Sequence, residues 1–198
     1  MPIKFKFEDS YKGAWVLLRQ AYNLILRCED RVFSEYGLTT EQHAVLMVVK
    51  HISAPVRITD IALWLDRSVN SVSMMVDRMV KAGLVRRIRD RKDRRTVFVT
   101  ITSKAEKAFV PATVAGWELI QEILSPLSDK DRLTLVRLLE TLRDKAYDYL
   151  GSGSGEVVEE IRKHEAANMA QFMKQAAEYK SLSTPEAKRQ GGKKKKAI

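Results

Sequence analysis

The segment from Ser68 to Thr102, SVNSVSMMVDRMVKAGLVRRIRDRKDRRTVFVTIT, decides the fold of this chain. Its apolar residues first recur at helical spacing and then, after Gly83, alternate as they do in β-strands. The pattern predicts one short helix followed by a two-stranded hairpin. Between Arg86 and Arg95 there are seven basic residues and two acidic ones. A helix that fits a major groove, beside a basic loop that reaches a minor groove, is the arrangement expected of a DNA reader.

The short helix has two chemically different sides, and Ser68 is its predicted N-cap. The apolar side is expected to pack on the preceding helix and consists of Val69, Val72, Met75, Val76, Met79 and Val80. The N-terminal residues of a recognition helix meet base edges. The candidates for base contacts are therefore Ser68, Asn70, Ser71, Ser73 and Met74, of which two or three are expected to touch bases. The alternative is that Ser68 only caps and that Ser71 meets phosphate.

The charged residues near the hairpin are candidates for phosphate contacts or for ion pairs within the protein. Arg78 is assigned secondarily to phosphate, since Asp77 and Arg78 fit an ion pair or a brace for the hairpin better. Arg86 and Arg87 are either phosphate contacts or ordinary charges at a strand edge. The hairpin tip is predicted to contact DNA, because a solvated tip needs only a few charges. Its residues are Arg91, Lys92, Asp93, Arg94 and Arg95.

The flanking sequence is mostly helical, so the fold class is mostly α (α+β), a winged helix-turn-helix with N- and C-terminal dimerisation helices. Thr39 and Gln42 fit a capping box, and Ser128 is a second predicted cap. The predicted parts are an N-terminal dimerisation helix (1–36), a winged helix-turn-helix (37–102), C-terminal dimerisation helices (103–150), a linker with a further helix (151–180) and a disordered basic tail (181–198).

Charge indicates the kind of partner. The 198-residue chain carries a net charge of +10, with +7 between residues 66 and 107 and +5 between residues 186 and 198, so the remainder sums to −2. Two basic patches on a nearly neutral scaffold favour a polyanion, nucleic acid first and an anionic membrane surface second. No signal peptide or membrane span is recognisable, and the single cysteine excludes an intrachain disulfide, so a cytoplasmic location is expected.

Structural roles are expected for the cysteine and for most of the large aromatic residues, and neither a metal site nor a catalytic site is expected. Cys28 is expected to be a buried structural cysteine, because reactivity needs a lowered pKa and access. Three scattered histidines, including His43, make a metal site unexpected. No nucleophile–base pair, phosphate loop or cofactor motif supports an enzyme. Aromatic residues could line an effector pocket but are more often core, namely Trp15, Tyr22, Trp64 and Trp117.

One helix-turn-helix domain bound to one half-site gives little sequence specificity. The apolar flanking helices are therefore predicted to form a two-fold homodimer. Such a dimer reads two half-sites roughly 34–36 Å apart, or a multiple of that distance. The leading hypothesis is a homodimeric, sequence-specific DNA-binding regulator. The alternative is a non-specific or architectural nucleic-acid binder that uses the basic wing and the lysine tail.

Between Tyr11 and Leu150 the chain resembles the MarR (multiple antibiotic resistance regulator) family. The resemblance is carried by Leu38–Gln42, Asp77–Arg87, Asp93–Arg95 ahead of Val97–Thr102, and Ser128–Asp131. It implies a regulator, usually a repressor, that binds a pseudo-palindromic operator and is released by a small, often aromatic, ligand. It also implies that Arg95 enters the minor groove and that Asp93 orients it. Met74 and Ala105 depart from the family pattern, as does the extension after Leu150.

Overall fold

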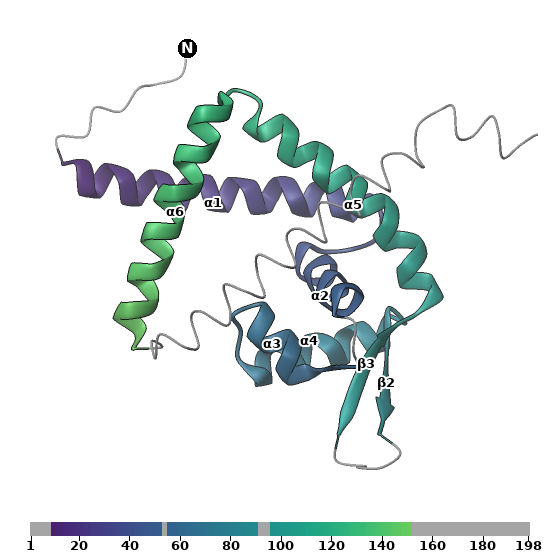
Figure 1. Ribbon diagram of the computed structural model, residues 1–198. Helices are drawn as coiled ribbons and strands as arrows, with labels where there is room; N and C mark the ends of the chain where they lie inside the picture. The colour runs from purple at the N-terminus through teal and green to yellow at the C-terminus, as the bar shows by residue number, and fades with distance from the viewer. Residues whose placement is uncertain (1–8, 53–54, 91–95, 152–198) are drawn as a thin grey trace, which may run out of the picture.

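The computed structural model describes residues 9–52, 55–90 and 96–151. These residues form helices α1 (Ser10–Ser34), α2 (Thr40–His51), α3 (Ile58–Trp64), α4 (Val69–Lys81), α5 (Ser103–Leu124) and α6 (Asp129–Leu150), with strands β1 (Val56–Arg57), β2 (Val85–Arg89) and β3 (Val97–Ile101). The predicted fold class, a mostly helical winged helix-turn-helix, is confirmed. Figure 1 shows a compact head, made of α2 to α4 and the sheet, which lies below α1, with α5 running down beside it on the right and α6 on the left.

The core of the head forms where α4 packs its apolar stripe against α2, α3 and the sheet. Val72, Val76 and Met79 of α4 are fully buried, together with Leu46 of α2. Burying one such side chain contributes about 1.5–3 kcal/mol relative to leaving it in water. This shared core fixes α4 rigidly to the head.

Two residues of the predicted apolar side of this helix are in fact exposed. Val69 is 48% exposed and Val80 is 38% exposed, so the prediction that they pack inside is wrong. Both lie at the edge of the buried stripe, one in the first turn of α4 and the other in the last. A wheel assigns sides but does not show how far the neighbouring elements reach along the helix.

Side-chain caps begin the helices where the sequence predicts them. Thr39 and Gln42 form the capping box of α2, with Thr39 Oγ1 accepting from the Gln42 N–H at 3.2 Å and Gln42 Oε1 accepting from the Thr39 N–H at 3.1 Å. Ser128 Oγ accepts from the Asp131 N–H at 3.2 Å and so caps α6. Each cap satisfies backbone donors that the first helical turn leaves without partners.

The turn between α3 and α4 depends on one residue in an unusual backbone conformation. Asp66 has φ +48°, in the left-handed region that aspartate tolerates better than most residues. This conformation lets the Arg67 N–H donate to the Ala62 carbonyl at 2.9 Å and close the end of α3. The chain can then enter α4 at a sharp angle, as a helix-turn-helix requires.

The sheet has the strand order β1-β3-β2, and both pairings are antiparallel. Arg87 lies opposite Val99, and Ile88 lies opposite Phe98. The Asp90 N–H donates to the Thr96 carbonyl at 2.9 Å and continues the ladder beyond the strands. β1 has only two residues, because Ile58 already begins α3. The β2–β3 hairpin projects from the head on the side away from α1 (Figure 1).

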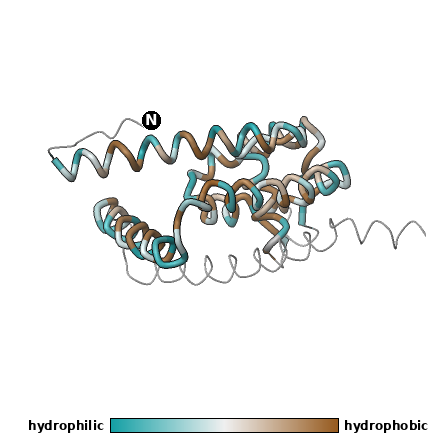
Figure 2. The backbone as a smooth tube through the Cα atoms, turned by 90° about the horizontal axis from the view of Figure 1, so that it is seen from above, coloured by the Kyte–Doolittle hydropathy of each residue, from teal (hydrophilic) through white to brown (hydrophobic). Residues whose placement is uncertain are grey.

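The long helices leave much apolar surface uncovered. On α1, Trp15 is 63% exposed, and Tyr22 is also exposed. None of the residues of α6 is buried, although the helix is rich in leucine. Figure 2 shows α6 set apart from α1, with hydrophobic residues distributed along both helices.

The cysteine does not lie where the sequence led us to expect it. Cys28 is exposed in this chain, so the prediction of a buried structural cysteine is wrong. The cause is that α1 is mostly exposed and buries only Gly13 and Phe33. A cysteine on a long helix is buried only if that helix is covered on the cysteine's side.

Candidate nucleic-acid interface

The outward side of α4 presents one line of exposed side chains. Asn70, Met74 and Arg78 are all exposed and follow one another at intervals of four residues. Residues four apart lie on the same helix face. We call these three residues the reading line. Ser71 and Ser73, which were also candidates for base contacts, are only partly exposed.

Ser68 occupies the position that both of its predicted roles require. Its Oγ accepts from the Ser71 N–H at 3.2 Å and therefore caps α4. The hydroxyl keeps a proton that it can donate to another acceptor. Ser68 is exposed, so the capping role does not remove it from the surface that α4 presents.

Arg87 of β2 clamps the recognition helix from the side of the hairpin. Its Nη2 donates to the Ser73 carbonyl at 3.3 Å and to Ser73 Oγ at 3.2 Å. The same nitrogen lies 3.0 Å from Asp77 Oδ1. These contacts join the hairpin to the middle of α4, and we call the set the Arg87 brace. Asp77 therefore braces the hairpin, which is one of the two roles considered for it.

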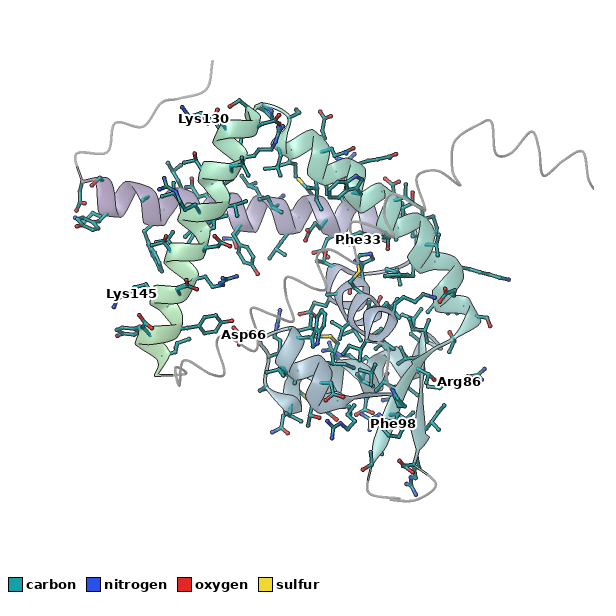
Figure 3. The ribbon with its side chains drawn as sticks, viewed as in Figure 1. Phe33, Asp66, Arg86, Phe98, Lys130 and Lys145 are labelled. Carbon is teal, nitrogen blue, oxygen red and sulfur yellow. The ribbon has the colours of Figure 1, made fainter. Side chains whose placement is uncertain are left out.

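The brace separates two arginines that the sequence left equivalent. Strand side chains alternate between faces, so Arg87 shares a face with the buried Val85, whereas Arg86 lies on the other face. Arg86 points outward from the hairpin in Figure 3. The alternation that starts at Val85 was the sequence signal that could have assigned Arg87 to the α4 side.

The C-terminal end of α4 is held by the beginning of α5. Thr102 Oγ1 donates to the Gly83 carbonyl at 2.7 Å, and Lys104 Nζ donates to the Ala82 carbonyl at 2.8 Å. Both carbonyls lie just beyond the last turn of α4, where a cation also interacts favourably with the helix dipole. The recognition helix is thus connected to one of the long helices as well as to the hairpin.

The wing tip falls outside the described residues. The predicted contacts at its five positions therefore stay predictions, for Arg91, Lys92, Asp93, Arg94 and Arg95. The described base of the hairpin adds exposed Arg86 and Arg89 beside the tip. A basic hairpin of this kind lies next to α4 and could contact the phosphates that border the same groove.

A buried histidine joins the head to the long helices, and the sequence did not reveal it. The His43 ring of α2 stacks on Phe33 of α1 at 4.1 Å between centroids, and lies 5.2 Å from Phe109 of α5. His43 Nε2 lies 3.0 Å from Thr113 Oγ1, which donates to the Phe109 carbonyl at 2.8 Å. We call this the His43 joint. The residues lie on three helices far apart in sequence, so local patterns could not bring them together.

The aromatic residues that were considered for an effector pocket lie on three different helices. Trp15 and Tyr22 are exposed on α1, whereas Trp64 of α3 and Trp117 of α5 are partly buried. Within the described residues, no group of three or more His, Cys, Asp or Glu side chains is arranged to hold a metal ion. Nor is any helix in that part of the chain long and apolar enough to cross a bilayer.

A second connection between α1 and α2 is electrostatic. Asp30 Oδ1 of α1 accepts from the backbone N–H of Thr40 at 3.0 Å, at the beginning of α2. This hydrogen bond to the charged carboxylate lowers the pKa of Asp30. Burial, together with the neighbouring Asp30 charge, raises the pKa of Glu29. The pKa values of two adjacent carboxyl groups of α1 therefore shift in opposite directions.

Comparison with known proteins agrees with this geometry. A family described as a winged helix DNA-binding domain matches residues 38–105. The chain is 29% identical over 118 residues to the HTH-type transcriptional regulator PecS of Dickeya dadantii (strain 3937), a match that covers 59% of this chain and 71% of PecS. PecS is a transcriptional regulator, in agreement with the prediction that this chain is a DNA-binding regulator and not an enzyme.

Solved structures share the fold at low sequence identity. The organohalide-sensing regulator RdhR-CbdbA1625, bound to 2,4-dichlorophenol, superposes with a TM-score of 0.63 at 21% identity, covering 73% of this chain and 89% of that one. A cysteine-to-serine mutant of MarR from E. coli, complexed with operator DNA, gives a TM-score of 0.56 at 24% identity, covering 68% and 99%.

Proposed function

Because this chain is a winged-helix transcriptional regulator of the MarR family, we propose that it binds a pseudo-palindromic operator as a homodimer and represses transcription until a signal releases it. It works in the cytoplasm, beside the DNA that it binds. The observation that carries the proposal is the way α4 is held, with its reading line outward and its inner stripe fixed in the core.

A rigidly held helix suits sequence reading, because base contacts require the helix to enter the major groove in one orientation. The shared core, the Arg87 brace and the grip of α5 each hold a different part of α4. The basic hairpin beside α4 supplies phosphate contacts, which position the protein without reading the sequence. Base specificity then comes from the short reading line, and much of the affinity comes from the wing.

The homodimer is supported by the uncovered apolar surface of the long helices. Contiguous exposed apolar patches are rare on monomeric proteins and mark interaction sites. On α6 such exposed residues include Leu133, Val136, Leu138 and Leu142, which recur along the helix. Two copies that cover these helices symmetrically would carry two α4 helices into successive major grooves.

The proposed signal acts at the junction between the long helices and the head. The His43 joint and the Asp30–Thr40 hydrogen bond connect α2 to α1 and α5. A ligand that shifts α1 or α5 would therefore also shift α2 and change the distance between the two α4 helices. RdhR-CbdbA1625 is seen with 2,4-dichlorophenol, so a small aromatic molecule is the proposed effector class.

Selection from a pool of randomised duplexes, with the full chain, tests DNA reading and dimerism together. The proposal expects an enriched inverted repeat whose half-sites are centred roughly 34–36 Å apart, or a multiple of that, with two protomers bound to each duplex. Enrichment of no sequence at all would refute sequence reading. An enriched site that binds a single protomer would refute the homodimer.

Release by a ligand needs a separate measurement. Small phenols and aromatic acids are titrated into the complex between the full chain and its selected duplex, and anisotropy reports the release of DNA. A saturable loss of DNA affinity with at least one aromatic compound supports regulation of this kind. If the whole panel leaves DNA affinity unchanged, the aromatic effector is contradicted, and DNA reading itself stands.

A further inference from the structure

The most unusual member of the reading line is a hydrophobic side chain. Met74 is 62% exposed, at the centre of the face that α4 turns outward. Its neighbour Met75 is 5% exposed and belongs to the core, so the two methionines serve opposite sides of the helix. Burying a large apolar side chain at the centre of a reading surface is favourable if the DNA offers it an apolar partner.

Neighbouring polar side chains are already engaged with the hairpin. Ser73 Oγ accepts from Arg87 Nη2 at 3.2 Å, and Asp77 lies 3.0 Å from the same nitrogen. The Arg87 brace thus orients both side chains toward β2. Of the central outward residues, Met74 is left to meet the floor of a groove, with Asn70 one turn before it and Arg78 one turn after it.

The floor of the major groove offers one apolar group that identifies a base. Thymine presents its 5-methyl group there, whereas the other base edges present hydrogen-bond donors and acceptors. Asparagine can bond to adenine through two hydrogen bonds. A line of Asn70 followed by Met74 therefore matches adenine and thymine edges, and it matches guanine and cytosine poorly.

We propose that Met74 is a specificity-determining residue that packs on a thymine 5-methyl group, so that each half-site is read as A·T-rich at its centre. This inference rests on the proposed function, since it requires α4 to enter the major groove. It adds to the proposed function the way in which one base is recognised, namely through a buried contact with its methyl group. Met74 departs from the family pattern, and the contact with a thymine methyl group is the consequence of that departure.

The size of the effect follows from the burial of one methyl group. Such burial changes affinity by about fourfold, from the transfer free energy of one carbon. A two-fold dimer makes the contact twice, so removing both methyl groups should weaken binding by about fifteenfold. An effect of this size is easily resolved in a binding titration.

Deoxyuridine provides the test, because it pairs like thymidine and lacks only the methyl group. The selected duplex is synthesised with each symmetric pair of thymidines replaced in turn, and affinities are measured for the full chain and for Met74→Ala. At one pair of positions the unsubstituted protein should lose about fifteenfold in affinity. Met74→Ala should lose much less than that at the same pair.

Two variants provide controls within the same helix. Met74→Leu keeps an apolar side chain of similar volume, so it should keep most of the sensitivity to deoxyuridine. Val80→Ala removes another exposed apolar side chain, in the last turn of α4, and should leave that sensitivity unchanged. Together they separate the contact at Met74 from a general loss of apolar surface.

The outcomes distinguish this inference from the proposed function. If no sequence is enriched in the selection, the proposed function fails and this inference fails with it. If a site is enriched but deoxyuridine weakens the unsubstituted protein and Met74→Ala equally, or weakens neither, sequence reading stands and the role of Met74 is overturned. A selected site that has no thymine in its half-sites overturns it as well.

Discussion

The Arg87 brace yields a quantitative prediction, because the structure assigns Arg87 to the protein and not to DNA phosphate. Arg87→Ala removes an ion pair with Asp77, whose side chain is 55% exposed, and hydrogen bonds to Ser73. A half-exposed ion pair contributes about 0.2–1 kcal/mol, and one net hydrogen bond contributes about 0.5–1.5 kcal/mol. The free energy of unfolding should therefore fall by about 1–2 kcal/mol, which lowers Tm by about 3–6 °C.

The loss of DNA affinity in Arg87→Ala has an upper limit, and the salt dependence of binding shows whether Arg87 contacts phosphate. Binding requires the braced orientation of α4, so affinity cannot fall by more than the brace contributes, about 5- to 30-fold per protomer. The slope of log affinity against log salt should not change, because the variant keeps every phosphate contact. If Arg87 bound phosphate instead, its removal would reduce that slope by about one per protomer. The assay is fluorescence anisotropy with the selected duplex over a salt series, beside thermal unfolding of the free protein.

Arg86→Ala is the matched control, since it removes the same charge from the opposite face of β2. Its free energy of unfolding should stay within about 0.5 kcal/mol of that of the unsubstituted protein. The double variant with Asp77→Ala should show a coupling of about 0.2–1 kcal/mol between Arg87 and Asp77. An unchanged Tm together with a reduced salt slope in Arg87→Ala would refute the brace and assign Arg87 to phosphate.

Four other changes test separate parts of the structure. Gly116→Ala places a Cβ 2.9 Å from Phe33 Cε1. Overpacking should cost about 1–3 kcal/mol, which outweighs a helix-propensity gain of about 1 kcal/mol and lowers Tm. A raised Tm would contradict tight packing at the His43 joint. Asp30→Asn should lower stability at neutral pH, because a carboxyl whose folded pKa is lowered stabilises the fold above its unfolded pKa. That stability disappears as pH falls through the folded pKa, so urea titrations of the two proteins should converge in acid; a difference independent of pH would contradict the assignment. Leu139→Arg on exposed α6 should produce monomers by light scattering and abolish cooperative operator binding, and an intact dimer would place the interface elsewhere. Truncation after Gly151 should retain sequence preference while it weakens non-specific binding; loss of the preference would favour the architectural alternative.

Local signals in the sequence predicted the helix beginnings well. Thr39, Ser68 and Ser128 all cap as predicted. A cap depends on a hydrogen bond to a residue three positions away, so it can be read from a short window. The same holds for Gly83, whose φ of +71° ends α4 as its position in the sequence indicates.

Interactions between distant segments could not be predicted in this way. The bond between His43 and Thr113 spans 70 residues, and the contact between Arg87 and Ser73 crosses from a strand to a helix. Periodicity gives the side of an element on which a residue lies, but it does not identify the neighbour that covers that side. The same limit explains why Cys28 was placed in a core that α1 does not have at that point.

The candidate site shows both outcomes within one helix. The exposed positions of Asn70 and Met74 agree with their choice from the sequence as candidates for base contacts. The engagement of Ser73 by Arg87 did not follow from the wheel, since it depends on how β2 packs against α4. The five wing-tip positions lie outside the described residues, and their contacts with DNA stay predictions.

The most direct test of a two-fold DNA reader compares the selected operator with a duplex in which one half-site is scrambled. At the same salt concentration, the intact site should bind two protomers, and the scrambled duplex should bind at least about thirtyfold more weakly, since only half of the base contacts can form. Equal affinity for the two duplexes, or one protomer on the intact site, would contradict the account.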